Sequence, residues 1–482
     1  MTLPARPVRV LFLLQRPEAW GNVASIWRSM VGDPAFQPVV WLLPYNAENM
    51  ALSARHQPLH QDLLASQGVQ WVKWMPELHL RVGQFDVAVF THPYDRERPR
   101  ALWFDRVRAC VPKIVYVPYG LSVGAGAKNL RLQFAQPLHI GADLVVARSP
   151  AERAMYARYC PAGDAKVQVL GHPRFDRLLE ELQAVDTREL KARIGARIAI
   201  LWNSHFSFGH RFSQSSNFSS FDLLGPELLD YFAARRTTLC LLWRPHPGLF
   251  PELLRQRLLT SEQLSVLRTE LGEIGIVLDE QADHLPAFAC SQALISDPGS
   301  FLFEYLATGK PLLPLINPEG EPLNAEATCL VTACGAASCF DEVEGFIAAV
   351  ASDDVARGRY LVLREQHLPL LDGRAGFRVC SALLGRPAPT VDSSVLNYAT
   401  GRALDWMLMS GQRQVSARVM DMPPVLARLQ AGLRQIRMEK SAQPCWRKWS
   451  RRQFNRARTS LGELVKQKPW LMALASRIRG VR

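Results

Sequence analysis

The sequence predicts an α/β protein with two Rossmann-like domains that face each other across a cleft, followed by a basic helical extension. Three observations predict this arrangement. Short apolar runs alternate with stretches of helical spacing, the alternation starts again near Arg197, and it ends near residue 385. Near-continuous apolar runs are typical of strands buried on both faces of a parallel sheet. We predict an N-terminal domain over residues 1–175, a second domain over 176–385 and the extension over 386–482.

The first domain contains six apolar runs of strand length. The predicted strands are Val8–Leu14, Pro38–Leu43, Phe85–Thr91, Lys113–Pro118, Ala142–Ala147 and Lys166–Leu170. Two stretches have helical spacing, Glu97–Cys110 and Pro150–Cys160, and Ser149 is predicted to cap the second of them. The linker to the second domain is expected between Gly171 and Leu190.

The second domain repeats the pattern. Its predicted strands are Arg197–Trp202, Thr237–Trp243, Ile274–Leu278, Gln292–Asp297 and Pro311–Leu315. Its predicted helices are Glu227–Arg236, Glu252–Leu259, Ser261–Leu271, Ser300–Thr308 and Glu342–Val350. Ligands of such sheets bind at the carboxyl ends of the strands, so polar residues that follow these strands are the candidates for a site.

The composition is that of a globular protein, with 482 residues of which 48% are hydrophobic and 21% charged. It excludes a chain that is disordered throughout. No apolar run reaches the roughly 18 residues of a membrane span, and Val8–Leu14 is too short for a signal peptide.

The nine cysteines include no C-x-x-C pair, which argues against a zinc knuckle or a redox motif. Scattered thiols fit a reducing compartment, so we expect a cytoplasmic protein.

The net charge of +13 is concentrated in the C-terminal tail. Arg428 to Arg482 holds fifteen Lys or Arg and two acidic residues, whereas the rest of the chain has 42 of each sign. Trp446, Trp449 and Phe454 lie among these basic residues. Basic amphipathic helices with Trp at the boundary suit an anionic membrane surface, so we expect residues 428–482 to hold the protein on the inner face of the plasma membrane. The alternatives are nucleic acid, which we disfavour, and packing of the tail on the protein's own body.

The segment Trp243–Pro247, Trp-Arg-Pro-His-Pro, directly follows a predicted strand. Its two prolines fix φ on both sides of His246. Arg244 can hold a phosphate through two parallel hydrogen bonds, and His246 can donate to a phosphate or act as an acid. The alternative is a proline-rich turn whose arginine and histidine are solvated. A long polar loop over residues 205–221 begins nearby with His205.

The segment Ile295–Leu306 ends a predicted strand at Asp297, turns at Gly299 and begins a helix for which Ser300 is the predicted N-cap. The free N–H groups of a helix N-terminus suit a phosphate. Glu304 lies one turn into the helix, where it can accept hydrogen bonds from a ribose diol. The alternative is an ordinary capped helix with Glu304 in a surface ion pair.

Three further segments fall at strand ends. Val117–Lys128 is glycine-rich but lacks the Gly-Lys-Ser/Thr of a Walker loop, so it is either a mobile acceptor loop or a flexible connection. Gly171–Asp176, Gly-His-Pro-Arg-Phe-Asp, is either a hinge that closes the cleft or a turn whose residues satisfy local backbone groups. For His92–Asp95 we expect the structural turn. No spacing of histidines or carboxylates predicts a metal site, and no cofactor is predicted. The absence of G-x-S-x-G argues against a serine hydrolase.

Taken in order, these segments resemble the CDP-glycerol glycerophosphotransferase family, whose members prime and polymerise teichoic acids. The resemblance runs from about residue 85 to about 315, through Pro-Tyr-Asp, Val-Pro-Tyr-Gly, Gly-His-Pro-Arg-Phe-Asp, Ile-Leu-Trp-Asn-Ser-His, Arg-Pro-His-Pro and Ser-Asp-Pro-Gly-Ser-Phe-Leu-Phe-Glu-Tyr-Leu-Ala-Thr-Gly-Lys-Pro. It implies a GT-B fold. It also implies transfer, without a bound metal, of a polyol phosphate from a CDP-activated donor to a hydroxyl of a lipid-linked glycan.

The resemblance assigns the donor to the second domain. Arg244, His246 and Ser300 would face the donor diphosphate, and Glu304 would lie nearer the ribose or cytosine. The remaining candidates for substrate binding are Asp297, Gly299, His205 and Gly120, with Lys310 as a weaker one.

The sequence departs from the family in the glycine-rich loop of the first domain. The teichoic acid polymerases carry a catalytic His-Gly there as the presumed base, whereas this chain has Tyr119-Gly120. Tyrosine is ordinarily a poor base at neutral pH, so the catalytic candidates are Tyr119, His92 and His246, with His205 as a further possible base. The alternatives for the whole protein are a GT-B glycosyltransferase that uses a nucleotide sugar, a nucleotide-sugar epimerase, which we disfavour, and a non-catalytic membrane adaptor on a GT-B scaffold.

Overall fold

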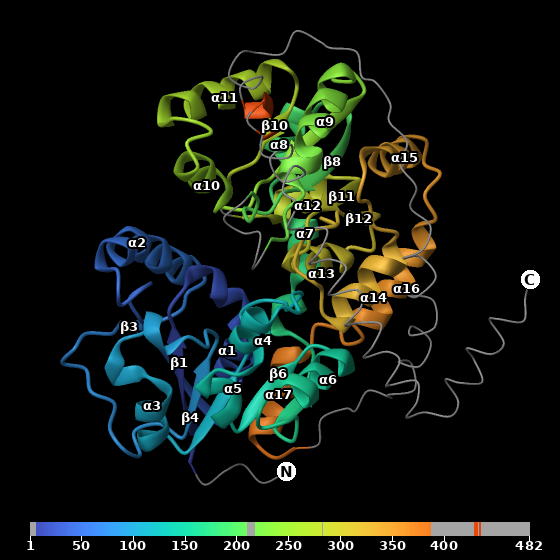
Figure 1. The fold of residues 1–482 in the computed structure, drawn as a ribbon. Coiled ribbons are helices and arrows are strands. Elements are labelled where there is room, and N and C mark those ends of the chain that lie inside the picture. The colour runs from blue at the N-terminus through green and yellow to red at the C-terminus, as the bar shows by residue number, and fades with distance from the viewer. Residues whose placement is uncertain (1–5, 210–216, 282, 387–428, 432, 435–482) are drawn as a thin grey trace, which may run out of the picture.

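The computed structural model describes residues 6–209, 217–281, 283–386, 429–431 and 433–434. Within them the chain forms two parallel sheets, each covered by helices, and Figure 1 shows the resulting units as two lobes. The predicted α/β class with two Rossmann-like units is confirmed.

The first sheet has seven parallel strands in the order β3-β2-β1-β4-β5-β6-β7. They are β1 (Val8–Leu14), β2 (Phe36–Leu42), β3 (Trp71–Lys73), β4 (Val87–Phe90), β5 (Lys113–Tyr116), β6 (Leu144–Ala147) and β7 (Val167–Val169). All six predicted strands are present. Strand β3 was not predicted, because it is a three-residue edge strand with two exposed residues. Along β1, Val10, Phe12 and Leu14 enter the core on one face of the sheet, and Leu11 and Leu13 enter the core on the other.

The second sheet has five parallel strands in the order β10-β9-β8-β11-β12. They are β8 (Ile198–Asn203), β9 (Leu239–Trp243), β10 (Val277–Leu278), β11 (Ala293–Ser296) and β12 (Leu312–Pro314). All five were predicted. Aromatic rings pack on one face of this sheet, where the Trp202 ring lies 5.1 Å from that of Trp243 and 5.8 Å from that of Phe221.

Helices connect the strands in both units. In the first unit the α-helices and 3-10 helices (η) are η1 (Pro17–Asn22), α1 (Ala24–Val31), α2 (Met50–Ser66), η2 (Asp95–Glu97), η3 (Arg100–Leu102), α3 (Phe104–Cys110), α4 (Ala127–Phe134), α5 (Pro137–Gly141), α6 (Pro150–Tyr159) and η4 (Pro173–Phe175). The later helices are α7 (Leu178–Ala184), α8 (Arg188–Ile194), α9 (Phe221–Ala234), α10 (Leu249–Arg255), α11 (Ser261–Glu273), α12 (Leu285–Cys290), α13 (Ser300–Leu306), α14 (Ala325–Cys334), α15 (Phe340–Ala351), α16 (Arg357–His367) and α17 (Ala375–Leu383).

Two helix predictions for the first unit have different outcomes. The cap of α6 is confirmed, because the Ser149 hydroxyl accepts a hydrogen bond from the Glu152 amide. The prediction of one helix over Glu97–Cys110 is wrong, because the chain forms η2, η3 and then α3. Pro99 and Trp103 have extended ψ values of 134° and 155°, which interrupt any continuous helix.

The two units are connected at several places. The chain passes from β7 through η4 into α7, and α17 returns to pack against α1 of the first unit. Gly376 of α17 approaches α1 so closely that a Cβ there would lie 2.5 Å from the backbone of Ser25. The division into residues 1–175 and 176–385 stays a prediction. The structure shows in addition that α17, from the end of the second range, packs on the first unit.

The glycine-rich loop of the first unit is tied to the second unit. The Ala125 amide donates to the Pro322 carbonyl at 2.7 Å, and the Asn324 amide donates to the Val123 carbonyl at 2.8 Å. These bonds flank an antiparallel bridge between Gly124 and Leu323. The structure therefore shows a docked cross-connection where we expected a mobile loop or a flexible connection.

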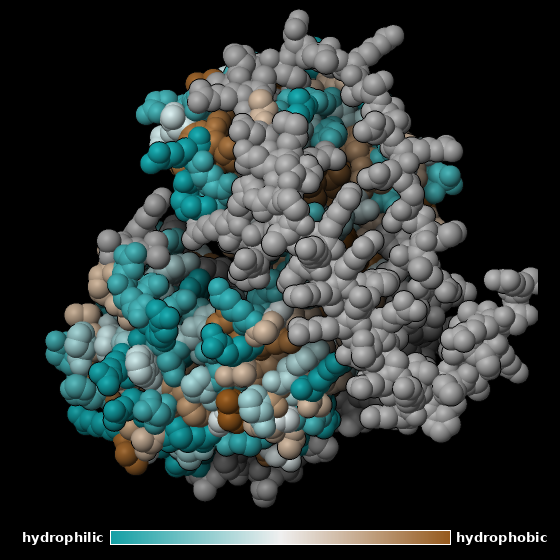
Figure 2. All heavy atoms as spheres, in the orientation of Figure 1, coloured by the Kyte–Doolittle hydropathy of each residue, from teal (hydrophilic) through white to brown (hydrophobic). Residues whose placement is uncertain are grey.

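The described part of the C-terminal extension packs on the second unit. Leu429 and Leu433 are fully buried, and Gln430 and Arg434 contact the Asp230 carboxylate of α9 at 3.0 and 3.3 Å. For these few residues the alternative of packing on the protein's own body holds. The other residues of the predicted tail lie outside the described ranges. Within the described ranges, no helix combines the length and the hydropathy of a membrane-spanning segment. On the face in Figure 2, hydrophilic residues predominate over the described surface of the first unit.

Candidate functional site

Each sheet has a point where consecutive crossovers leave in opposite directions. In the first sheet this point lies between β1 and β4, and in the second between β8 and β11. Ligands of doubly wound sheets bind outside the carboxyl ends of the strands at such points. Arg16 and His92 follow β1 and β4, and His205 and Asp297 follow β8 and β11.

Asp297 anchors the polar loop of the second unit. Its carboxylate accepts hydrogen bonds from the His205 amide at 2.7 Å, the Ser220 amide at 2.8 Å and the Ser219 hydroxyl at 3.0 Å. Burial raises the pKa of Asp297 to about 7, although these hydrogen bonds favour the ionised form. The carboxylate thus holds both ends of the loop against the end of β11.

His205 and His246 lie beside one another in the second unit, with ring centroids 5.1 Å apart. Burial lowers the pKa of His205 to about 3 and that of His246 to about 4, so both rings are neutral at pH 7. The Nδ1 atom of His246 accepts a hydrogen bond from the Gly248 amide at 3.0 Å. The proton of the neutral ring is therefore assigned to Nε2, which leaves Nε2–H as a hydrogen-bond donor.

Arg244 is buried and already engaged by the loop after β10. Its Nη1 lies 2.6 Å from Asp279 Oδ2, and its Nη2 donates to the Gln281 carbonyl at 2.7 Å. The sequence did not predict this pairing, because Asp279 is 35 residues away along the chain. A phosphate bound by Arg244 would have to share the guanidinium with Asp279.

Helix α13 begins differently from the prediction. Ser300 is not the N-cap: that position is Gly299, with extended φ and ψ of −173° and −176°. Ser300 is the first helical residue, and its side chain favours the ionised form of Glu304. Glu304 is buried, with Oε1 2.7 Å from Arg174 Nη1 and Oε2 3.4 Å from His284 Nε2. The alternative of a surface ion pair is therefore wrong, because the pair that Glu304 forms is internal.

His284 is a candidate that the sequence analysis missed. It occupies the N-cap position of α12, and its ring lies next to Glu304. Burial lowers the pKa of His284, the charge of Glu304 opposes this, and Arg174 and Arg244 act in the same direction as burial. His284 is therefore in contact with Glu304, and the charge of Arg244 also acts on it. Its signal in the sequence is weak, since it precedes a short Leu-Pro helix start.

Lys310, the weaker candidate, has a different function in the structure. Its ammonium group donates to the carbonyls of Phe288, Ala289 and Ser291 at 2.7 to 3.1 Å. These carbonyls are at the C-terminal end of α12, where a positive charge is favourable.

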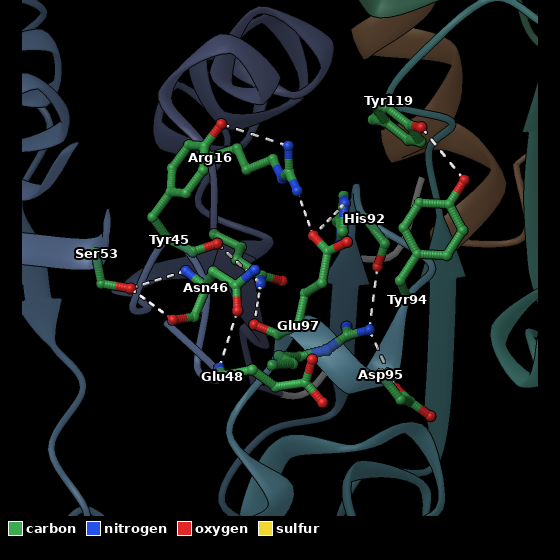
Figure 3. Close-up of polar contacts among 12 residues, drawn as sticks. Arg16, Tyr45, Asn46, Glu48, Ser53, His92, Tyr94, Asp95, Glu97 and Tyr119 are labelled. Atoms are coloured by element: carbon green, nitrogen blue, oxygen red, sulfur yellow. Dashed lines mark hydrogen bonds and ion pairs between the residues drawn. The ribbon is translucent and has the colours of Figure 1, made fainter. Parts of the chain in front are cut away.

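The candidates of the first unit form a group of their own, shown in Figure 3. The hydroxyls of Tyr94 and Tyr119 are 3.3 Å apart, and the His92 ring lies 5.3 Å from the Tyr119 ring. His92 Nε2 lies 3.5 Å from Glu97 Oε2, and Glu97 also pairs with Arg16. Burial lowers the pKa of His92 to about 2, with the charge of Arg16 adding to the effect.

The exposure of this first group differs from residue to residue. The His92 side chain is only 3% exposed and its Nδ1 has no hydrogen-bond partner among the described residues, whereas Tyr119 is 36% exposed. A Cβ built on Gly120 would meet no atom within 4 Å, so there is free space beside the residue that follows Tyr119. Within the described ranges, no group of three or more His, Cys, Asp or Glu side chains is placed to hold a metal ion.

No family model and no curated protein matches this sequence. Solved structures with a similar fold include the S. aureus MnaA–UDP complex, with 14% identity over 80% of this chain and 100% of that chain and a TM-score of 0.53. The Methanocaldococcus jannaschii UDP-GlcNAc 2-epimerase in complex with UDP-GlcNAc and UDP has 13% identity over 78% of this chain and 99% of that chain, with a TM-score of 0.51. The wall teichoic acid polymerase TagF has 11% identity over 78% of this chain and 88% of that chain, with a TM-score of 0.47. The chain thus has a GT-B-like fold, as predicted.

Proposed function

We propose that this protein is a transferase that moves a polyol phosphate, such as glycerol phosphate, from a CDP-activated donor to a hydroxyl of a lipid-linked glycan. The observation that carries the proposal is the position of Arg244, His246, Ser300 and Glu304, which all follow strands at the carboxyl edge of the second sheet. That edge is where ligands bind in this kind of fold. The order of motifs that resembles the glycerophosphotransferases supports the same assignment.

In the proposed reaction the acceptor oxygen attacks the phosphorus atom that carries the polyol. The bond from this phosphorus to the oxygen of CMP breaks, CMP leaves, and the hydroxyl proton passes to a base. His246 is suited to stabilising the leaving phosphate, because its neutral ring donates from Nε2. Glu304 is suited to accepting hydrogen bonds from the ribose hydroxyls, because Arg174 and His284 favour its ionised form.

We assign the acceptor to the group around Tyr119 in the first unit. Of the candidate bases, His92 has a carboxylate close to its Nε2 atom. Burial lowers the pKa of His92 to about 2, so the ring serves as a base only when that burial is relieved. Tyr94 and Tyr119 cover His92, so we propose that the acceptor hydroxyl is bound beside Tyr119 and Gly120. The base becomes accessible when the Tyr119 ring turns aside.

The second candidate function is an enzyme that uses a nucleotide sugar. It is favoured by the structural similarity to the M. jannaschii UDP-GlcNAc 2-epimerase, which was solved with UDP-GlcNAc and UDP. The third is a non-catalytic adaptor, for which the basic tail would be the functional part. In each case we place the protein in the cytoplasm, on the inner face of the plasma membrane.

Calorimetric titration with CDP and with UDP separates these functions. We expect CDP to bind more tightly than UDP, and CDP-glycerol to release CMP when a lipid-linked glycan is added. Preference for UDP would favour the nucleotide-sugar enzyme, and binding of neither nucleotide would favour the adaptor. The folded His246→Asn variant is the control. It measures background release of CMP that does not depend on the proposed site.

A further inference from the structure

The segment Gly171–Asp176 joins the two groups of candidate residues. It lies where the chain passes from the first sheet to the second, and η4 forms its centre. Gly171 has φ of +80°, and a Cβ there would come within about 3.2 Å of Leu370 and Ala375. Both the left-handed backbone and the close packing require glycine at this position.

On one side the segment holds the loop of Tyr119. His172 is 2% exposed, and its Nε2 lies 2.8 Å from the carbonyl oxygen of Pro118, the residue directly before Tyr119. Its Nδ1 accepts a hydrogen bond from the Arg174 amide at 3.3 Å. These two contacts assign the proton to Nε2. Burial lowers the pKa of His172 to about 3, so this neutral form persists across the physiological range.

On the other side the segment holds helix α13, which carries Glu304. Arg174 donates from Nε to Asn22 Oδ1 at 2.9 Å and from Nη1 to Glu304 Oε1 at 2.7 Å. Asn22 belongs to the first unit and Glu304 to α13 of the second, so one guanidinium connects the two units. The Glu304 side chain is only 3% exposed.

The residues between these two contacts are held in place. The Phe175 amide donates to the His172 carbonyl, and the Asp176 carboxylate accepts hydrogen bonds from the amides of Ala375 and Gly376 at 2.9 and 2.8 Å. His172 and Arg174 are two residues apart within this turn, so neither contact can shift far without the other.

We propose that Arg174 is a positioning residue for the donor nucleotide: its guanidinium holds the Glu304 carboxylate toward the ribose hydroxyls, and together with His172 it sets that carboxylate relative to the loop that carries Tyr119. The proposal rests on the proposed site in the second unit. It requires only a nucleotide with a ribose, and holds for CDP and UDP alike.

The physical reason is the burial of Glu304. The titratable or charged groups that face it are Arg174 from η4, His172 from the same segment and His284 from α12. Burial alone would raise the pKa of Glu304, but the charge of Arg174, followed by that of His284, lowers it below the usual value. Without Arg174 a carboxylate this deeply buried takes up a proton, and it then loses acceptor capacity for a diol.

The test is calorimetric titration with CDP at pH 6, 7 and 8, on the full chain. We expect Arg174→Met to weaken CDP binding about tenfold or more at pH 7, and we expect part of the loss to be recovered at pH 8 as Glu304 ionises. Glu304→Gln should bind weakly at every pH. The matched control is Arg177→Met, three residues later, whose side chain is 47% exposed and faces Glu180 and Glu181.

A purely structural function of Arg174 would weaken binding without the recovery at pH 8, and that result would overturn the proposal. Wild-type CDP affinity in Arg174→Met at all three pH values would do the same. If Arg174→Met does not fold, Arg174→Lys replaces it. A lysine cannot contact both Asn22 and Glu304, so several-fold weaker binding is expected and unchanged affinity contradicts the proposal.

If the wild type binds UDP and not CDP, the proposed donor is wrong, and the same series with UDP tests Arg174. Binding of neither nucleotide overturns both proposals.

Discussion

Arg148 and Glu326 form a buried ion pair between the two units, with Nη2 2.5 Å from Oε2 and side chains 2% and 4% exposed. Arg148 follows β6 of the first unit, and Glu326 lies in the first turn of α14. The Ser149 hydroxyl also bonds to Glu326, and the Arg148 guanidinium lies 4.2 Å from the centre of the Phe303 ring. The pair therefore joins the carboxyl edge of the first sheet to the helices that cover the second.

Glu326→Gln should destabilise the protein by about 3–5 kcal/mol, because it removes the carboxylate that is ion-paired with the buried Arg148 guanidinium. Urea unfolding measures this loss. The double variant Arg148→Met/Glu326→Leu should recover much of it, since both charges are then removed. Asp186→Asn, which breaks an exposed ion pair with Arg188, is the control and should leave the unfolding midpoint unchanged. Equal stability of Glu326→Gln and the wild type would show that this contact does not hold the units together.

His246→Asn should lower kcat/KM by roughly 10²-fold, the scale of losing one electrostatic donor. The asparagine oxygen can still accept the hydrogen bond from the Gly248 amide, so the loop should keep its conformation. His246→Ala loses both interactions and serves for comparison. Release of CMP from CDP-glycerol is the measurement, with the thermal midpoint as the check on folding. Normal turnover in folded His246→Asn would remove His246 from the site.

Acid should destabilise the protein in part through His139, a buried histidine of α5. Burial lowers its pKa to about 3 in the folded state, from an ordinary value of 6.5. As the pH falls below about 6.5, His139 therefore binds a proton in the unfolded chain but remains neutral in the folded chain. The stability that His139 contributes is complete above pH 6.5 and is lost as the pH falls towards 3, at up to about 1.4 kcal/mol per pH unit.

Denaturant unfolding between pH 7.5 and 5 compares His139→Asn with the wild type. The variant should lose stability less steeply with falling pH. His79→Asn, at an exposed position, should retain the slope of the wild type. Parallel curves for His139→Asn and the wild type would contradict a buried neutral histidine at this position.

The C-terminal tail should bind vesicles of anionic lipid. Residues 435–482 contain thirteen Lys or Arg and two acidic residues, and Leu429 and Leu433 before them are buried on the second unit. In flotation the full chain should float and a chain that ends at Arg434 should not, while both release CMP with an acceptor that lacks the lipid. Added salt should weaken flotation, because surface charge is screened. Flotation of both chains, or of neither, would remove the tail from membrane binding.

The shorter chain is cut after Arg434 because of the packing described above. A chain that ends at Pro424 also loses Leu429 and Leu433, and it should be less stable by several kcal/mol from the lost apolar burial. A comparison of thermal midpoints for the two truncated chains separates this structural contribution from any contact with lipid.

Local sequence patterns were sufficient to predict the α/β class, eleven of the twelve strands in the described residues, and the strand ends that carry Arg244, His246 and Asp297. These follow from local patterns, because a strand buried on both faces must be apolar and the chain leaves it through polar residues. Such patterns do not detect elements that are short or interrupted. The edge strand Trp71–Lys73 buries too little to show a pattern, and the break of the predicted helix Glu97–Cys110 depends on two backbone conformations.

The partners of the candidate residues depend on contacts between segments that are far apart in the sequence. Arg244 meets Asp279, Glu304 meets Arg174, and Arg148 meets Glu326, across 35, 130 and 178 residues of chain. Nothing in the sequence near an arginine states which buried carboxylate will neutralise it, because that depends on how the two sheets are placed against each other. The same placement turned the glycine-rich loop from an expected mobile element into a connection between the units.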